Sequence, residues 1–142
     1  MSVFGVEGTA EAAARGALQA ALEVWNGVDL LSRELAAELK APLRIGIGIH
    51  VGTAVVGLVR TSETEALQFL GDTGNIAAKL EAHSKQLGCT LVASAAALRL
   101  VTSDAARIEL MPIAIAGKSD PIDVAVFRSK SDLRKILSDG RS

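Results

Sequence analysis

Aromatic side chains are scarce in this chain of 142 residues: they make up 3% of it, and tyrosine is absent. That scarcity argues against a protein that stacks single-stranded bases on aromatic rings. Fifteen basic side chains face sixteen acidic ones, so the net charge of −1 lacks the positive excess of a nucleic-acid binder. No apolar run approaches the roughly 18 residues of a membrane-spanning helix. We therefore expect neither a nucleic-acid partner nor a membrane segment in this chain.

Cysteine is also nearly missing, since Cys89 is the single one. One thiol cannot form an intrachain disulfide or build a zinc site, and the N-terminal residues do not resemble a signal peptide, so we expect a cytoplasmic protein. The two histidines, His50 and His83, are not at metal-ligand spacing, and each is interpreted as a packed or surface residue. What the chain does have is 49% apolar residues, enough for one globular core.

The spacing of the apolar residues predicts an alternation of helices and strands, which favours a mixed-sheet α/β sandwich. A helix is expected over residues 10–40, which contain no proline and are followed by Pro42. Aliphatic residues alternate over 43–50, and a second apolar run covers 54–59, so these two runs predict a hairpin. The next segments predict a strand over 67–70 and a helix from about 74 to 86 that is capped by Asp72. A strand over 89–93 and a short helix over 94–101 follow. The last segments predict a second hairpin, formed by 107–115 and 122–127, and a helical turn over 132–137.

Two glycine-containing segments resemble phosphate-binding motifs but fail their spacing. Residues 117–119, Gly-Lys-Ser, match the end of a P-loop, but Pro112 stands where its first glycine belongs. Gly46 and Gly48 begin a dinucleotide fingerprint, but Val51 occupies the place of its third glycine. Neither segment is interpreted as a nucleotide-binding motif.

The segment 67–81, LQFLGDTGNIAAKLE, is more informative than these two motifs, because the segments before and after it fit one longer pattern in the same order. A strand enters a Gly-Asp-Thr turn, and a helix leaves it with an asparagine, small residues and a basic-Leu-Glu sequence. Upstream, residues 44–57 (RIGIGIHVGTAVVG) contain Gly-Ile-His-x-Gly, and residues 85–97, the terminal hairpin and the N-terminal segment also match. Together they resemble the class III nucleotide cyclases, which make cyclic AMP or cyclic GMP, over nearly the whole chain.

The resemblance implies an α+β fold: a ferredoxin-like nucleotide cyclase fold lacking its first strands, with a mixed, mainly antiparallel sheet. Residues 1–130 would form a partial cyclase domain, and residues 131–142 a C-terminal tail. The family's first strand lies in the middle of its sheet, so its loss would leave neighbouring strand edges unpaired. We expect either that the remaining strands close up through a right-handed β-α-β crossover, or that a second chain supplies the pairing.

The resemblance also implies a reaction, in which the ribose 3′ oxygen of ATP attacks its own α-phosphorus and pyrophosphate leaves. Asn75 and Lys79 would be the catalytic residues, one holding the ribose and the other stabilising charge on the α-phosphate; four positions apart, they share a helix face. Lysine replaces the family's arginine there, which keeps the charge but loses the planar fork. Without the resemblance, both would be ordinary helix-surface residues. The implied substrate-binding residues are Gln68, Leu70, Asp72 and Lys118.

The glutamine at the purine-recognition position, Gln68, can both donate and accept, so it fits adenine or guanine, and ATP is the expected substrate with GTP as the alternative. The two aspartates that hold Mg²⁺ or Mn²⁺ in the complete family site have no counterpart, so we expect no metal ligands and no tightly bound metal in this chain. The hypothesis is an adenylate cyclase-type domain that is inactive alone and pairs as a homodimer or with a complete cyclase subunit. One alternative is a non-catalytic regulatory or dimerisation partner; another is an unrelated ferredoxin-like domain, which the charge and the few aromatics disfavour.

Overall fold

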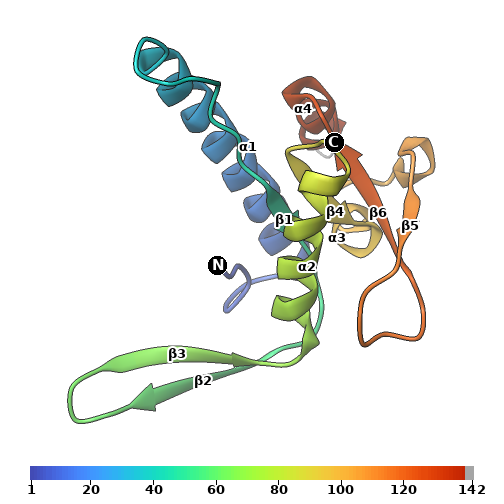
Figure 1. The fold of residues 1–142 in the computed structure, drawn as a ribbon. Helices are drawn as coiled ribbons and strands as arrows, with labels where there is room; N and C mark the ends of the chain where they lie inside the picture. Colours follow the sequence, from blue (N-terminus) through green and yellow to red (C-terminus); the bar gives the residue numbers. More distant parts are fainter. Residues whose placement is uncertain (140–142) are drawn as a thin grey trace.

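The computed structural model describes residues 1–139, which form a four-stranded sheet with helices against both faces and a hairpin that extends away from it (Figure 1). This mixed arrangement confirms the expected α+β class. None of the described helices combines the length and the apolarity that a bilayer crossing requires. The elements are α1 (Ala10–Glu34), β1 (Ile47–Ile49), β2 (Val55–Arg60), β3 (Glu65–Leu70), α2 (Asp72–Gln86), β4 (Leu91–Ser94), α3 (Ala95–Arg99), a 3-10 helix (Ala105–Arg107), β5 (Met111–Ile113), β6 (Ile122–Phe127) and α4 (Lys130–Asp139).

The strand order of the sheet is β1-β4-β6-β5, which puts β1 at one edge. β1 runs parallel to β4, whereas β6 is antiparallel to β4 and to β5, as the predicted second hairpin requires. Because α2 lies between β1 and β4 in the chain, these strands close up through a β-α-β crossover, one of the two expected arrangements. Within residues 1–139, the outer edge of β1 has no strand beside it.

The predicted pairing of residues 43–50 with residues 54–59 is wrong, because β1 and β2 belong to different sheets. β2 instead pairs antiparallel with β3 along the full length of both strands. The physical reason is burial: every residue of β4 is buried, so a parallel partner beside it shields more apolar surface than a hairpin in solvent. The loop after β1 then lies on α2, where the Thr73 hydroxyl donates to the Thr53 carbonyl at 2.8 Å.

Two predicted helix boundaries are also wrong. α1 ends at Glu34 rather than at residue 40, and the chain turns back so that the Leu43 N–H donates to Ser32 Oγ at 2.9 Å. Asp72 does not cap α2 but is its first residue; Gly71 precedes it with a φ of 129°, a backbone angle that favours glycine. The Asp72 carboxylate therefore acts on the positive end of the helix dipole.

Two glycines allow α2 to lie directly on β1. A Cβ atom added to Gly48 would overlap the Ala77 carbonyl and the Glu81 backbone nitrogen, and one added to Gly46 would overlap the Ser84 hydroxyl. Larger side chains here would push α2 away from the sheet, because a packed interior has no spare volume. The glycine spacing that resembles a dinucleotide motif therefore serves contact between a helix and a strand.

Two apolar clusters cover the two faces of the sheet. One packs α1, α3 and α4 around Leu91 and Phe127, and the other packs α2 over Val92 and Val124. α4 is longer than the predicted helical turn and buries three apolar side chains, Leu133, Ile136 and Leu137. The division into a domain over 1–130 and a tail over 131–142 stays a prediction, and residues 140–142 of that tail lie outside the described part.

Candidate functional site

α2 and the loop between β5 and β6 carry three of the expected site residues, and a hydrogen bond joins the two segments. Asn75 and Lys79 stand about one turn apart on α2, and Lys79 Nζ donates a hydrogen bond of 2.5 Å to the Ala116 carbonyl, 37 residues later in the chain. The same loop carries Lys118, whose backbone N–H donates to the Ile115 carbonyl at 3.0 Å and closes the turn. The bond from Lys79 therefore ties the loop that carries Lys118 to α2.

The other expected residues lie along β3 and its junction with α2. Gln68 and Leu70 share one face of the hairpin because they are two positions apart, and both are exposed, Leu70 to 65%. Asp72 opens α2, one turn before Asn75. Among residues 1–139, no side-chain hydrogen bond joins Gln68 to α2 or to the β5–β6 loop. Asp72 therefore belongs to the same helix as Asn75 and Lys79, whereas Gln68 lies on the hairpin, away from that helix.

His50 lies close to Lys118, although its sequence context favours only a packed or surface role. Burial and the nearby Lys118 ammonium both lower the pKa of His50. Its Nδ1 atom is buried and has no hydrogen-bond partner in the described part of the chain. The sequence does hold a signal: Gly46, Gly48 and His50 alternate along one side of the strand, the side against which α2 packs.

The charges of the cluster suit an anionic ligand. Lys79 and Lys118 contribute two ammonium groups, and the lowered pKa keeps His50 neutral at pH 7. The ammonium groups of Lys79 and Lys118 are charge-assisted donors that suit a phosphate group bound between α2 and the β5–β6 loop.

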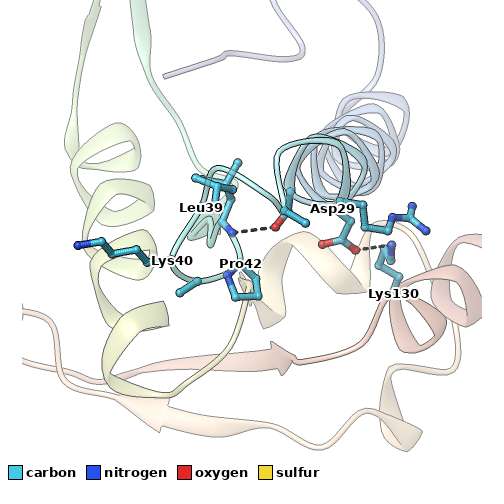
Figure 2. A pocket seen from close by; sticks show the side chains of 10 residues that line it. Asp29, Leu39, Lys40, Pro42 and Lys130 are labelled. Carbon is cyan, nitrogen blue, oxygen red and sulfur yellow. Dashed lines mark hydrogen bonds and ion pairs between the residues drawn. The ribbon is translucent and has the colours of Figure 1, made fainter.

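A hollow of about 530 Å³ lies elsewhere, between the C-terminal end of α1, residues 39–43 and the start of α4 (Figure 2). Asp29 of α1 and Lys130 of α4 form an ion pair there, with Oδ2 and Nζ 2.5 Å apart (Figure 2). None of the expected site residues lines this hollow. Its ion pair joins two helices, so we assign it to the packing of α4 on α1.

The carboxylates of residues 1–139 do not fit a pair of divalent metal ions. In that part of the chain, no three or more histidine, cysteine, aspartate or glutamate side chains gather in one place. A two-metal site needs several oxygen ligands that converge on both ions. The Mg²⁺ or Mn²⁺ that the resemblance implies for a complete site therefore has no such ligand set among the described residues.

A family model described as the adenylate and guanylate cyclase catalytic domain matches residues 1–124. The chain belongs to this family. Its relatives include Adenylate cyclase 1 of Rhizobium meliloti (strain 1021), 32% identical over 114 residues, and Adenylate cyclase of Anabaena cylindrica, 28% identical over 115 residues. The matches cover 78% and 76% of this chain but 17% and 23% of those proteins. The cyclase domain described here thus spans about a fifth of the length of these curated relatives.

Two solved structures of a bacterial light-regulated adenylyl cyclase share the fold of this cyclase domain. One superimposes with a TM-score of 0.59 at 22% identity and covers 96% of this chain and 42% of that chain. The other gives a TM-score of 0.58 at 20% identity and covers 95% of this chain and 40% of that chain. These likenesses confirm the expected cyclase fold and concern the fold alone.

Proposed function

We propose that this cyclase domain holds ATP for conversion to 3′,5′-cyclic AMP and pyrophosphate, the reaction of a phosphorus–oxygen lyase. The observation that carries the proposal is the hydrogen bond from Lys79 to the Ala116 carbonyl, because it draws the Lys118 loop to the helix that carries Asn75. Both curated relatives are named adenylate cyclases, which supports ATP over GTP as the substrate.

In this proposal the α2 residues orient the ribose and the α-phosphate. The exposed Asn75 amide can donate to and accept from the ribose hydroxyls. Lys79 has three N–H donors, of which one is engaged by Ala116, so two are free for phosphate oxygens that gain charge as the 3′ oxygen attacks. Lys118 attracts the leaving pyrophosphate. These are effects of position and charge, which is what phosphoryl transfer chiefly demands of a protein.

The purine ring would lie against the hairpin, beside α2. Gln68 offers a carbonyl and an NH₂ group to the edge of the base, and Leu70, two residues later on the same face, offers an apolar surface. The Asp72 carboxylate stands at the start of α2 as an acceptor, for which the exocyclic amino group of a purine would be a suitable donor. These side chains suit adenine or guanine, so the preference for ATP rests on the names of the curated relatives.

The hairpin itself supports a paired assembly, either a homodimer or a complex with a complete cyclase subunit. Two-stranded hairpins are marginally stable alone in water, and exposed apolar patches are typical of interaction sites. A complete cyclase subunit would supply the metal-binding aspartates, which a second copy of this chain would not, so this domain alone is expected to be inactive. The large apolar side chains of the hairpin, each 38% to 65% exposed, are Val55, Val56, Leu58, Val59, Leu67 and Leu70.

A second candidate function is that of a non-catalytic regulatory or dimerisation partner. It is favoured by the missing metal-ligand set in residues 1–139 together with the apolar hairpin, because pairing needs the hairpin and not the metal. The cytoplasmic location expected from the sequence stays a prediction.

Binding of a fluorescent ATP analogue to the purified domain tests the proposed function. Lys79→Met should weaken binding about tenfold or more, because it removes a charge-assisted contact. The matched control is Lys85→Met, which removes an exposed lysine in the last turn of the same helix and should leave binding unchanged. Equal affinities for the Lys79→Met variant and the unaltered domain would contradict the assignment.

A further inference from the structure

His50 lies beneath the first turns of α2, on the side of the helix that packs against β1. The contacts of α2 follow the strand in order: Gly46 faces Ser84, Gly48 faces Ala77, and Gly52 faces Thr73. A residue between Gly48 and Gly52 on the same side of the strand must therefore lie under the turn from 73 to 77. In agreement, His50 Nε2 is 3.6 Å from the point where a Gly52 Cβ would stand.

Three observations distinguish His50 from an ordinary core histidine. Its Nδ1 atom is buried and has no hydrogen-bond partner in residues 1–139, whereas buried polar atoms are almost always paired. It lies close enough to Lys118 for that ammonium to disfavour a second positive charge. Lys118 in turn belongs to the loop that Lys79 holds through Ala116. The ring is thus a neutral, incompletely satisfied base close to the Lys118 ammonium.

We propose that His50 is a further residue of the triphosphate site, and that it takes up a proton when a polyphosphate binds beside Lys118. The inference rests on the proposed function, since it needs the anion to bind at these lysines. The physical reason is that the anion cancels the repulsion from Lys118 and favours a charged imidazole. Affinity for the polyphosphate therefore rises as the pH falls through the pKa that His50 has in the complex.

The charges around His50 do not offer an alternative counter-ion that would already hold it protonated. The positive charge of Lys118 lowers the pKa of His50, so the imidazole stays neutral when no anion is bound. Strand β4 and residues 51–54 bring no charged side chain. The charged groups on the surrounding elements are Asp72, Lys79, Glu81 and Lys85 of α2, Lys118 and Asp120 of the β5–β6 loop, and the terminal amino group of Met1, whose side chain lies near Gly74.

The test is an NMR titration of the two histidine rings between pH 5 and 8, with and without saturating inorganic triphosphate. The pKa of His50 is expected to rise by about one unit on binding, which corresponds to about tenfold tighter binding at the acid end. His83, at the far end of α2 with Nδ1 3.2 Å from Gln86 Oε1, is the internal control, and its titration curve should not respond. A His83→Gln variant assigns the two signals without disturbing His50.

Calorimetry with the same triphosphate at several pH values distinguishes a failure of the inference about His50 from a failure of the proposed function. In the unaltered domain, binding should tighten toward low pH more than in a His50→Gln variant, and the titration of the ligand itself cancels in that comparison. If triphosphate binds but the His50 titration and the pH dependence are unchanged, the inference about His50 is overturned while the proposed function stands. If triphosphate does not bind at any pH, the proposed function is contradicted, and this inference with it.

Discussion

A single imidazole, that of His50, links the candidate site to the stability of the fold. In the folded domain, burial and Lys118 lower the pKa of His50 below the ordinary value of 6.5. Unfolding returns the ring to that value, so below about pH 6.5 the unfolded state binds more protons than the folded state. The contribution of His50 to stability is fully present above its pKa in the unfolded state, and it is lost as the pH falls toward its pKa in the folded state. The free energy of unfolding should therefore decrease with acid in this window.

A His50→Gln variant should flatten this pH dependence, because glutamine does not titrate. Urea unfolding of the unaltered domain and the variant between pH 5 and 7.5 measures the two slopes. A His83→Gln variant, which removes the other imidazole but leaves His50 and Lys118 in place, is the control and should retain the slope that His50 produces. Equal slopes with and without the His50 imidazole would show that its burial has no consequence for folding.

At the scale of elements, the contact between α2 and β1 positions the whole site. α2 carries Asn75 and Lys79, and the backbone of Gly48 lies directly beneath it. A helix that moved away from the strand would draw Lys79 from the Ala116 carbonyl and separate α2 from the β5–β6 loop. Close packing on glycine thus has a role in function as well as in stability.

Gly48→Ala should destabilise the domain by about 1–3 kcal/mol, since its methyl group would overlap backbone atoms of α2 that cannot rotate away. Gly27→Ala is a matched control in the middle of α1, where an added Cβ meets no atom within 4 Å. It should stabilise by about 0.5–1 kcal/mol through helix propensity. Chemical denaturation of both variants measures the difference. A Gly48→Ala variant as stable as the Gly27→Ala variant would argue against the described packing.

Local sequence patterns predict the elements of this fold better than their pairing. The periodicity over 74–86 and the two runs around residues 117–119 predict α2 and the β5–β6 hairpin, because each forms from neighbouring residues. The partner of β1 is not predictable in this way, since it is β4, more than 40 residues later, and the choice depends on burial. The site follows the same rule. The helical spacing predicts that Asn75 and Lys79 share one face of α2, but it does not predict that the β5–β6 loop packs beside them, because that contact depends on the tertiary fold.

At the scale of the whole molecule, the hairpin and the α2 cluster lie at adjoining parts of the domain, as β3 leads directly into α2 (Figure 1). The hairpin is apolar on both faces: Leu58 stands opposite Leu67 on one, and Val55 opposite Leu70 on the other. Gln68 shares the second of these faces. A subunit that covered this face would therefore lie next to the proposed base-binding residue, which is the geometry of a site shared between two chains.

Complementation of cyclase activity tests the central claim most directly. The partner is a complete cyclase subunit that retains its metal aspartates but has its own nucleotide-binding asparagine and basic residue replaced. We predict that neither chain alone makes cyclic AMP from ATP with Mg²⁺ or Mn²⁺, that the mixture does, and that Lys79→Met in this domain abolishes the gain while Lys85→Met does not. Cyclic AMP production by this domain alone, or a stable complex with no activity, would contradict the claim that it provides the nucleotide-binding half of a cyclase site.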